Sequence, residues 1–288
     1  TTCPSGVDYL HLVDIGRAEV EKKTSRSLGD KLLRKLLACL VPRANLFNLA
    51  LKLAKHARPL ALIMPRRLAA MICATPARIG PVDEVGKKDK IFVPEKNVLK
   101  RVILLQGCAQ RAIAPEINAA TLRLLSRVGV EVIVRQLATC CGGLAHHINE
   151  SDNAHNQMRA TAHAWKKDID KGDLDAIVVN TSGCGTTLKD YGQLLSSDSE
   201  LIETGKKIAS LAMDITEFLA TYIDLAPLPD KGLSVAYHAA CSLQHGQKVT
   251  ASPKILLSKA GFEVRQIAES HLCCGSAGVY NILQPELA

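Results

Sequence analysis

The chain has 288 residues, of which 47% are hydrophobic, 22% are charged and 3% are aromatic, and its net charge is +8. This length can bury one large domain or two modest ones, and the balance is that of a globular protein. The few aromatic side chains offer little stacking surface for single-stranded nucleic acid, and no apolar run of 18 residues could span a bilayer.

The positive charge is concentrated near the start of the chain. Residues 1–101 contain 20 Lys and Arg against 9 Asp and Glu, and the remainder contains 16 against 19. No zinc-finger spacing or RNA-binding motif accompanies this charge, so the sequence favours no nucleic-acid partner. An anionic membrane surface, touched peripherally, and an acidic partner subunit both fit the basic segment.

The ten cysteines occur without a secretory signal, because residues 1–20 lack a basic start followed by an apolar block. This combination indicates metal or redox chemistry in a reducing, cytoplasmic compartment rather than a disulfide scaffold. The chain does not begin with Met, so a targeting segment can be missing from its start.

The first third of the chain is predicted to be helical. Residues 1–16 form a turn-rich opening, and residues 17–79 form a basic helical segment in which leucines recur at helical spacing from Leu28 to Leu40. Two further amphipathic stretches, at 45–57 and 66–74, are bounded by prolines. Residues 80–97 are rich in Gly, Pro and charge and indicate a linker.

Short β-branched runs then alternate with helix-length amphipathic segments. The predicted strands are 102–105, 131–137, 176–179, 234–237 and 262–267, and the predicted helices are 115–128, 151–171, 208–222 and 253–260. This alternation predicts an α/β fold with parallel sheets and crossover helices.

An internal repeat lies within this region. Residues 124–132 (LLSRVGVEV) are echoed by residues 256–264 (LLSKAGFEV), and Cys108, Cys140 and Cys141 recur 133 residues later as Cys241, Cys273 and Cys274. Both copies have the pattern C-x₃₁-C-C-G. The repeat predicts two tandem duplicated units, residues 98–230 and residues 231–288.

Each cysteine of the first unit follows a predicted strand. Because the carboxyl ends of parallel strands meet at one edge of a sheet, four thiolates are expected to converge there, those of Cys108, Cys140, Cys141 and Cys184. Glycines flank these cysteines and supply tight turns whose N–H groups can face cluster sulfurs. The second unit repeats the arrangement with Cys241, Cys273 and Cys274.

Three interpretations of these cysteines compete: ordinary buried thiols, a structural zinc site and an iron–sulfur cluster. Two C-C-G turns with identical upstream spacing argue against buried thiols. Zinc stays open because Cys₄ suits it and because His238, His245 and His271 lie near the second set, although no C-x₂-C pair is present. The iron–sulfur cluster is favoured. Cys39 and Cys73 lie outside every motif and are interpreted as packing residues.

The C-x₃₁-C-C-G pattern resembles the cysteine-rich CCG domain of heterodisulfide reductase and its relatives. Within that superfamily the chain is similar, over nearly its whole length, to the glycolate oxidase iron–sulfur subunits. The segments that carry this similarity are 182–185 (SGCG), 191–193 (YGQ), 241–245 (CSLQH) and 270–278 (SHLCCGSAG). Residues 181–184 contain a single thiol where the reductase has two, which favours the glycolate oxidase branch and leaves four thiolates for a cubane cluster.

The opening residues TTCPSG resemble the end of a bacterial ferredoxin motif, C-x₂-C-x₂-C-x₃-C-P, with Cys3 as its last cysteine. The resemblance therefore implies that the chain is a fragment beginning inside a ferredoxin-like domain. In the second unit the chain has Ala239 where the family often has a further cysteine, and it ends at Ala288 before any closing cysteine.

The resemblance implies an electron-transfer role. All eight motif cysteines would be ligands of [4Fe-4S] clusters, with zinc as the alternative at one site. Electrons would come from a flavin-containing glycolate oxidase subunit that holds FAD and oxidises glycolate to glyoxylate, and would pass to a quinone-type acceptor. The chain has no G-x-G-x-x-G fingerprint, so the substrate site is expected on that partner. Alternatives are another CCG-domain oxidoreductase, such as those of lactate utilisation, anaerobic glycerol-3-phosphate oxidation or disulfide reduction, and a zinc-stabilised scaffold that is not an enzyme.

Overall fold

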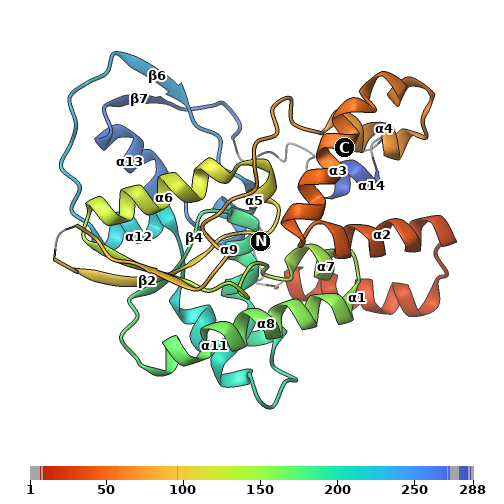
Figure 1. Cartoon of the computed structure of the whole chain (residues 1–288), viewed down its shortest axis with the longest axis horizontal. Coiled ribbons are helices and arrows are strands. Elements are labelled where there is room, and N and C mark those ends of the chain that lie inside the picture. Colours follow the sequence, from red (N-terminus) through yellow and green to blue (C-terminus); the bar gives the residue numbers. More distant parts are fainter. Residues whose placement is uncertain are drawn as a thin grey trace.

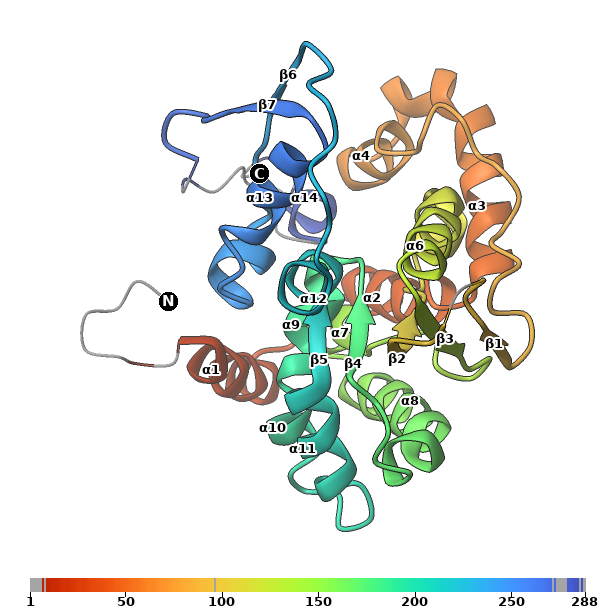
Figure 2. The same ribbon diagram turned by 90° about the vertical axis from the view of Figure 1, so that its left-hand side faces the viewer.

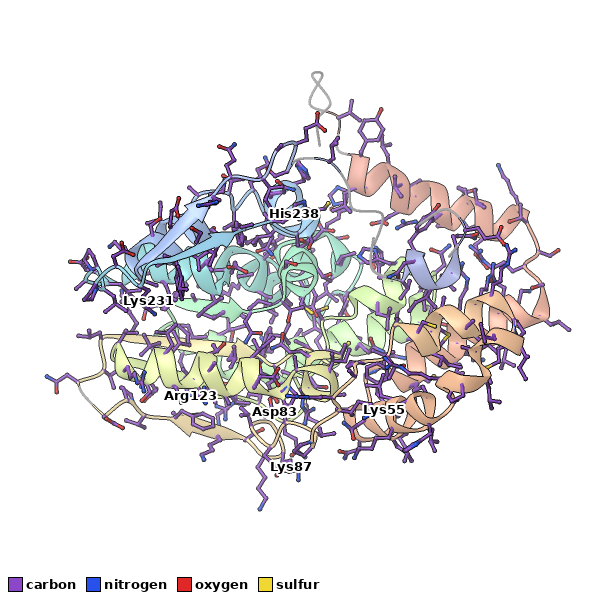
Figure 3. The ribbon with its side chains drawn as sticks, turned by 90° about the horizontal axis from the view of Figure 1, so that it is seen from above. Lys55, Asp83, Lys87, Arg123, Lys231 and His238 are labelled. Atoms are coloured by element: carbon purple, nitrogen blue, oxygen red, sulfur yellow. The ribbon has the colours of Figure 1, made fainter. Side chains whose placement is uncertain are left out.

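The computed structural model describes residue 7 and residues 9–95, 97–270, 272, 279–284 and 286. The chain starts with a helical layer, which lies to the right of the α/β core in Figure 3, where Lys55 marks α3. The elements of this layer are α1 (Tyr9–Lys23), α2 (Leu28–Leu40), α3 (Ala44–His56), the 3₁₀ helix η1 (Arg58–Ile63) and α4 (Arg66–Cys73). Helix α2 begins after Ser27, whose side chain accepts a hydrogen bond from the backbone N–H of Asp30.

A mixed sheet lies at the centre of the first unit (Figure 1). Among the described residues its strand order is β1-β3-β2-β4-β5. The strands are β1 (Lys90–Phe92), β2 (Lys100–Leu105), β3 (Val130–Val134), β4 (Ala176–Val179) and β5 (Ala212–Asp214). Strand β2 is parallel to both of its neighbours. Its Val102 lies opposite Val132 of β3 on one side and opposite Ala176 of β4 on the other. Strand β1 pairs antiparallel with β3 at the edge.

Helices cover both faces of this sheet (Figures 1 and 2). They are α5 (Gln110–Ile113), α6 (Pro115–Arg127), α7 (Gly143–His147), α8 (Ser151–Asp170), α9 (Ser182–Lys189), α10 (Tyr191–Leu194), α11 (Ile202–Leu211) and α12 (Ile215–Tyr222). Because side chains alternate along a strand, Val102 and Leu104 pack in one core with α6 and α12, and Ile103 and Leu105 pack in the other with α8 and α11. Such two-sided burial explains the continuous apolar strand sequences.

The predicted α/β class is confirmed, and three local expectations are corrected. The segment predicted to be a linker contains strand β1, because residues 90–92 (KIF) complete the edge beside β3. The single helix expected at 208–222 is split into α11, β5 and α12. Asp214 ends β5 and restarts the helix through a capping box with Glu217. Residues 9–16, predicted to belong to a turn-rich opening, are instead part of α1, which begins at Tyr9.

The second unit contains two described strands, β6 (Leu233–Ala236) and β7 (Phe262–Arg265), which pair in parallel. Between them lie the short π-helix η2 (Ser242–Gly246) and α13 (Ser252–Lys259), and α14 (Tyr280–Leu283) follows. The order of elements repeats that of β2, α5, α6 and β3. Val235 opposite Val264 corresponds to Val102 opposite Val132, so the sequence repeat is also a structural repeat. Within the described residues no helix has the length and apolarity needed to cross a bilayer.

Candidate metal centre

The candidate centre lies where the strand order reverses. The chain passes from β2 to β3 on one side and then crosses to β4 on the other side of β2. The carboxyl ends of these three strands therefore face one crevice, which is where α/β sheets bind ligands. Cys108 follows β2, Cys140 and Cys141 follow β3, and Cys184 lies in the first turn of α9 after β4.

The structure brings these four thiols together as two contacting pairs. Cys140 is hydrogen-bonded to Cys108, and Cys141 is hydrogen-bonded to Cys184. Three of the cysteines are buried, with exposed fractions of 8% for Cys108, 5% for Cys140 and 4% for Cys141, and Cys184 is half-buried. Four residues that span 77 positions of the sequence thus form one sulfur-rich site that is largely shielded from water.

The turn after the cysteine pair directs backbone N–H groups at the sulfur atoms. The N–H of Gly142 lies 3.5 Å from Cys140 Sγ, and the N–H of Gly143 lies 3.4 Å from Cys141 Sγ. Gly142 has a φ of +79°, and a Cβ there would lie 2.9 Å from the backbone oxygen of Ala154, so only glycine fits. These N–H donors stabilise negative charge on the thiolates.

The two thiols of the Cys141 and Cys184 pair differ in acidity. The hydrogen bond from Cys184 lowers the pKa of Cys141, opposed by burial and assisted by the N–H of Gly143. The bond to Cys141 and burial both raise the pKa of Cys184 well above its ordinary value. The pKa of Cys140 is likewise raised, by its hydrogen bond with Cys108 and by burial. Thiols that are hydrogen-bonded to one another in this way hold protons that a metal cation displaces when it binds.

A cationic side chain lies near the first cysteine. Arg111 of α5 interacts electrostatically with Cys108 and Asp83. Burial lowers the pKa of Arg111, and these two groups oppose that change. A guanidinium at this place offsets part of the negative charge that four thiolates would bring to the site.

Three neighbouring side chains hold the C-C-G turn. The Cys140 thiol donates to Gln157 Oε1 at 3.3 Å, Thr161 Oγ1 donates to the Cys140 carbonyl at 2.9 Å, and the Tyr191 hydroxyl donates to the Cys141 carbonyl at 3.0 Å. Gln157 and Thr161 belong to no sequence motif. They lie four residues apart on α8, so the helical face that points to the sheet was the signal by which they could have been found.

The donor set suits a cluster of several metal atoms. Four sulfurs around one zinc ion lie about 3.8 Å apart, since each Zn–S bond is about 2.3 Å long. Among the described residues, no three cysteine sulfurs lie within 4.8 Å of one another. The four sulfurs are therefore spaced more widely than the ligands of a single zinc ion, and four thiolates are the ligand set of an iron–sulfur cluster.

In the second unit the structure places Cys241 at the start of η2, packed against α9. Ser242 Oγ donates to Ser182 Oγ at 2.8 Å, and Thr186 Oγ1 donates to the Ser242 carbonyl at 2.9 Å. The segments that carry Cys184 and Cys241 are therefore adjacent. Cys3, Cys273 and Cys274 lie outside the described residues, as does His271. Cys39 is half-buried, but Cys73 is exposed, so the interpretation of Cys73 as a packing residue was wrong.

Comparisons with known proteins agree with this geometry. The family model described as "Cysteine-rich domain" (CCG) matches residues 102–189 and 235–288. The chain is 37% identical to the glycolate oxidase iron-sulfur subunit of Escherichia coli and 28% identical to the probable glycolate oxidase iron-sulfur subunit of Bacillus subtilis. These alignments cover 100% and 99% of the chain and 67% of each relative. Lactate utilization protein A of Geobacillus kaustophilus is 27% identical over 63% of the chain and 74% of that protein.

Proposed function

Because the chain belongs to the CCG cysteine-rich family of iron–sulfur electron-transfer subunits, we propose that it serves a glycolate oxidase-type complex. A partner subunit that holds FAD would oxidise glycolate to glyoxylate, and this chain would pass the electrons to a quinone-type acceptor. The observation that supports the proposal most strongly is the convergence of four thiols from three strand ends in one buried site.

We propose Cys108, Cys140, Cys141 and Cys184 as the ligands of a [4Fe-4S] cluster. When bound, the cluster supplies a one-electron carrier whose potential depends on hydrogen bonds to sulfur and on burial. The N–H groups of Gly142 and Gly143 are placed to provide those hydrogen bonds. The side chains of α8 and α10 hold the turn in position and exclude water from it.

We further propose Cys241, Cys273 and Cys274 as ligands of a second cluster and Cys3 as a ligand in a ferredoxin-like domain. This assignment rests on the repeated C-x₃₁-C-C-G spacing and on the Cys-Pro opening. Of the proposed domain boundaries we retain those at residues 79 and 230, because α1 crosses residue 16 and strand β1, which precedes residue 97, belongs to the sheet of the first unit.

The function is tested by reconstituting the complex. The chain is co-expressed with the flavin-containing subunit proposed as its partner, purified without oxygen and assayed for reduction of a soluble quinone analogue. We expect glycolate to support the highest rate and to reduce the iron–sulfur signal in electron paramagnetic resonance (EPR). Preference for lactate would assign the complex to the lactate-utilisation branch, to which the chain is also similar. A folded protein that contains zinc and no iron would overturn the electron-transfer assignment.

The helical layer supports a peripheral contact with an anionic membrane. Leu28 is 86% exposed, Leu62 is 96% exposed and Ile63 is 83% exposed, and residues 1–101 have an excess of 11 positive charges. Apolar and basic groups together bind anionic lipid surfaces, where quinones are also found. We expect the complex to sediment with vesicles containing phosphatidylserine but not with neutral vesicles, and high salt to release it. If the complex bound neither kind of vesicle, the exposed apolar and basic face would instead be assigned to contact with the partner subunit.

A further inference from the structure

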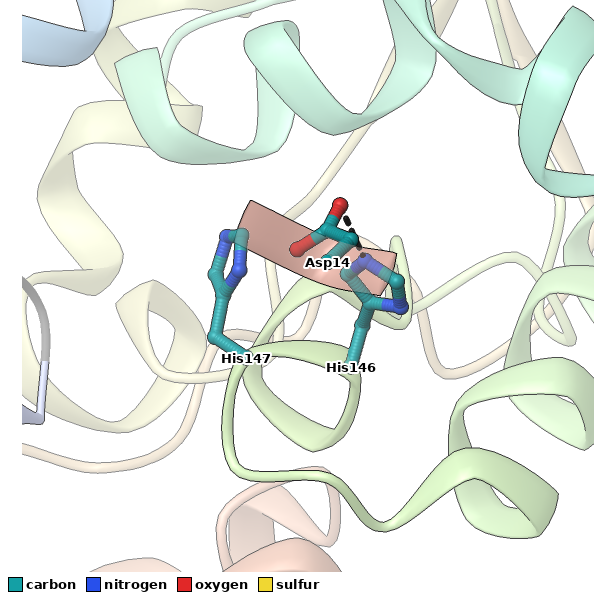
Figure 4. Close-up of side chains that lie close together, drawn as sticks. All are labelled: Asp14, His146 and His147. Carbon is teal, nitrogen blue, oxygen red and sulfur yellow. Dashed lines mark hydrogen bonds and ion pairs between the residues drawn. The ribbon is translucent and has the colours of Figure 1, made fainter. Parts of the chain in front are cut away.

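A second group of metal-ligating side chains lies apart from the cysteines. Asp14 of α1 and His146 and His147 of α7 each offer a ligand atom, and these atoms all lie within 4.8 Å of one another. Asp14 Oδ2 is 2.9 Å from His146 Nε2, and the two imidazole centroids are 5.6 Å apart. Figure 4 shows the Asp14 carboxylate between the two rings.

From this geometry we propose that Asp14, His146 and His147 bind a divalent transition-metal ion such as zinc. Two imidazoles and one carboxylate form a donor set that zinc and ferrous iron both accept, with open positions for water. Ligands of one zinc ion lie about 3.3 Å apart, given bonds of about 2.0–2.1 Å. The distance between Asp14 and His146 is already close to that value, and rotation of the His147 side chain completes the set.

The surroundings permit a cation to enter. Arg17 Nη1 lies 3.4 Å from the other oxygen of Asp14, Oδ1, but the Arg17 side chain is 43% exposed and can turn to solvent. His147 is exposed, and Asp14 and His146 are half-buried, so the metal has a direct path from solvent. Charge on Asp14 then offsets charge on the ion.

The site would hold α1 on the first unit. None of residues 9–23 is buried, and the contacts of α1 with this unit include polar ones, such as His11 to Asp190 at 2.9 Å and Asn149 to the Arg17 carbonyl at 3.2 Å. Figure 2 shows α1 beside α10, and the contact of Asp14 with His146 joins α1 to α7. His146 lies five residues after Cys141. A bound metal would therefore fix α1 next to the C-C-G turn of the cysteine centre.

The test uses the cluster-loaded full chain, equilibrated with one equivalent of Zn²⁺ and freed of loosely bound metal. Bound zinc is counted by mass spectrometry, and its ligands are identified by X-ray absorption at the zinc edge. We expect one zinc per chain with nitrogen and oxygen neighbours at about 2.0–2.1 Å. Hydrogen exchange within residues 9–23 should slow when zinc binds.

Variants separate a metal site from a simple hydrogen bond. His147→Ala leaves the Asp14–His146 hydrogen bond in place, yet it should weaken zinc binding at least about tenfold and abolish the slowing of exchange in α1. His163→Ala, which removes a histidine of α8, should change neither. Zinc with sulfur neighbours, or binding unchanged by both His147→Ala and Asp14→Asn, would overturn the proposal. Retained iron and EPR signal in each variant keep this result separate from the proposed function.

Discussion

The first and second units have the same cysteine spacing and the same order of strand, short helix, helix and strand, but they differ in depth of burial. In β2 every residue from Val102 to Leu105 is fully buried, whereas in β6 Leu233 is 55% exposed. The described part of the second unit has two strands, while the first has five and is covered on both faces. The repeated motif thus specifies topology, and the flanking strands and helices supply the shielding. Shielding is what allows a thiolate site to exclude water and tune a bound metal.

The largest expected effect is on metal binding in the first unit. Cys141→Ser removes the thiol with the lowered pKa from a buried site. We expect iron bound at this unit and its EPR signal to fall at least about tenfold. In the second unit, Cys241→Ser, at the position that corresponds to Cys108, should leave that signal intact, because Cys241 belongs to the adjacent turn.

Exposed Cys73 provides the control, since Cys73→Ser should retain all iron. Equal loss of the same signal from Cys141→Ser and Cys241→Ser would mean that the two turns share one site, and the distinction between the units would then be wrong.

A smaller effect is expected on folding. Ile103→Ala empties space in a fully buried part of β2, which should lower the free energy of unfolding by about 2–5 kcal/mol. Leu233→Ala in the exposed β6 should change it by no more than about 0.5 kcal/mol. Urea denaturation followed by circular dichroism measures both. Similar losses of unfolding free energy from the two variants would show that Leu233 is more deeply packed than its exposed fraction of 55% indicates.

The sequence predicted three of the five described strands of the first unit, β2, β3 and β4, because a buried parallel strand has an uninterrupted apolar run such as residues 102–105. It also predicted which cysteines follow those strands. Strand β1 was missed because three residues in a charged segment have no periodicity, and only pairing with β3 makes them a strand. Helical periodicity places Gln157 on the sheet-facing side of α8, but its contact with Cys140 and the contact of Asp14 with His146 depend on how the helices pack in the tertiary structure. The expectations for Cys3, Cys273 and Cys274 stay predictions.

A third prediction concerns acid stability. Burial raises the pKa of Asp168, but two hydrogen bonds and the charge of Arg135 outweigh it, so the pKa lies below its ordinary value. Asp168 therefore stabilises the fold above its unfolded pKa of about 4, and this contribution is lost as pH falls through the lower folded pKa. Asp168→Asn should cost about 2 kcal/mol at pH 7 and flatten the dependence of stability on pH below about 4.

The exposed pair in the second unit is the comparison for this effect. Glu263 contacts Ser234 and Arg265, and these bonds lower its pKa, but water screens an exposed pair. Glu263→Gln should leave the acid midpoint of unfolding unchanged. A shift as large as that of Asp168→Asn would contradict the difference in burial between the units.

The smallest expected effect is at the contact between the units. Thr186→Val on α9 keeps the shape of the side chain but removes its hydrogen bonds to the carbonyls of Ser242 and Ser182. Loss of these bonds should cost about 1 kcal/mol, and amide exchange in η2 and β6 should accelerate about fivefold, while exchange in β2 stays unchanged.

Ser210→Ala on α11 removes a similar bond, 2.9 Å from Ser210 Oγ to the Lys207 carbonyl, away from this contact, and should leave η2 and β6 unchanged. If Thr186→Val accelerated exchange in β2 as much as in β6, the two units would unfold together. The exposed strands of the second unit would then derive their stability from the whole molecule, and the first unit would not be an independent scaffold for its neighbour. Acceleration confined to η2 and β6 instead means that the second unit is held on a preformed first unit through α9, the helix on which Cys184 lies.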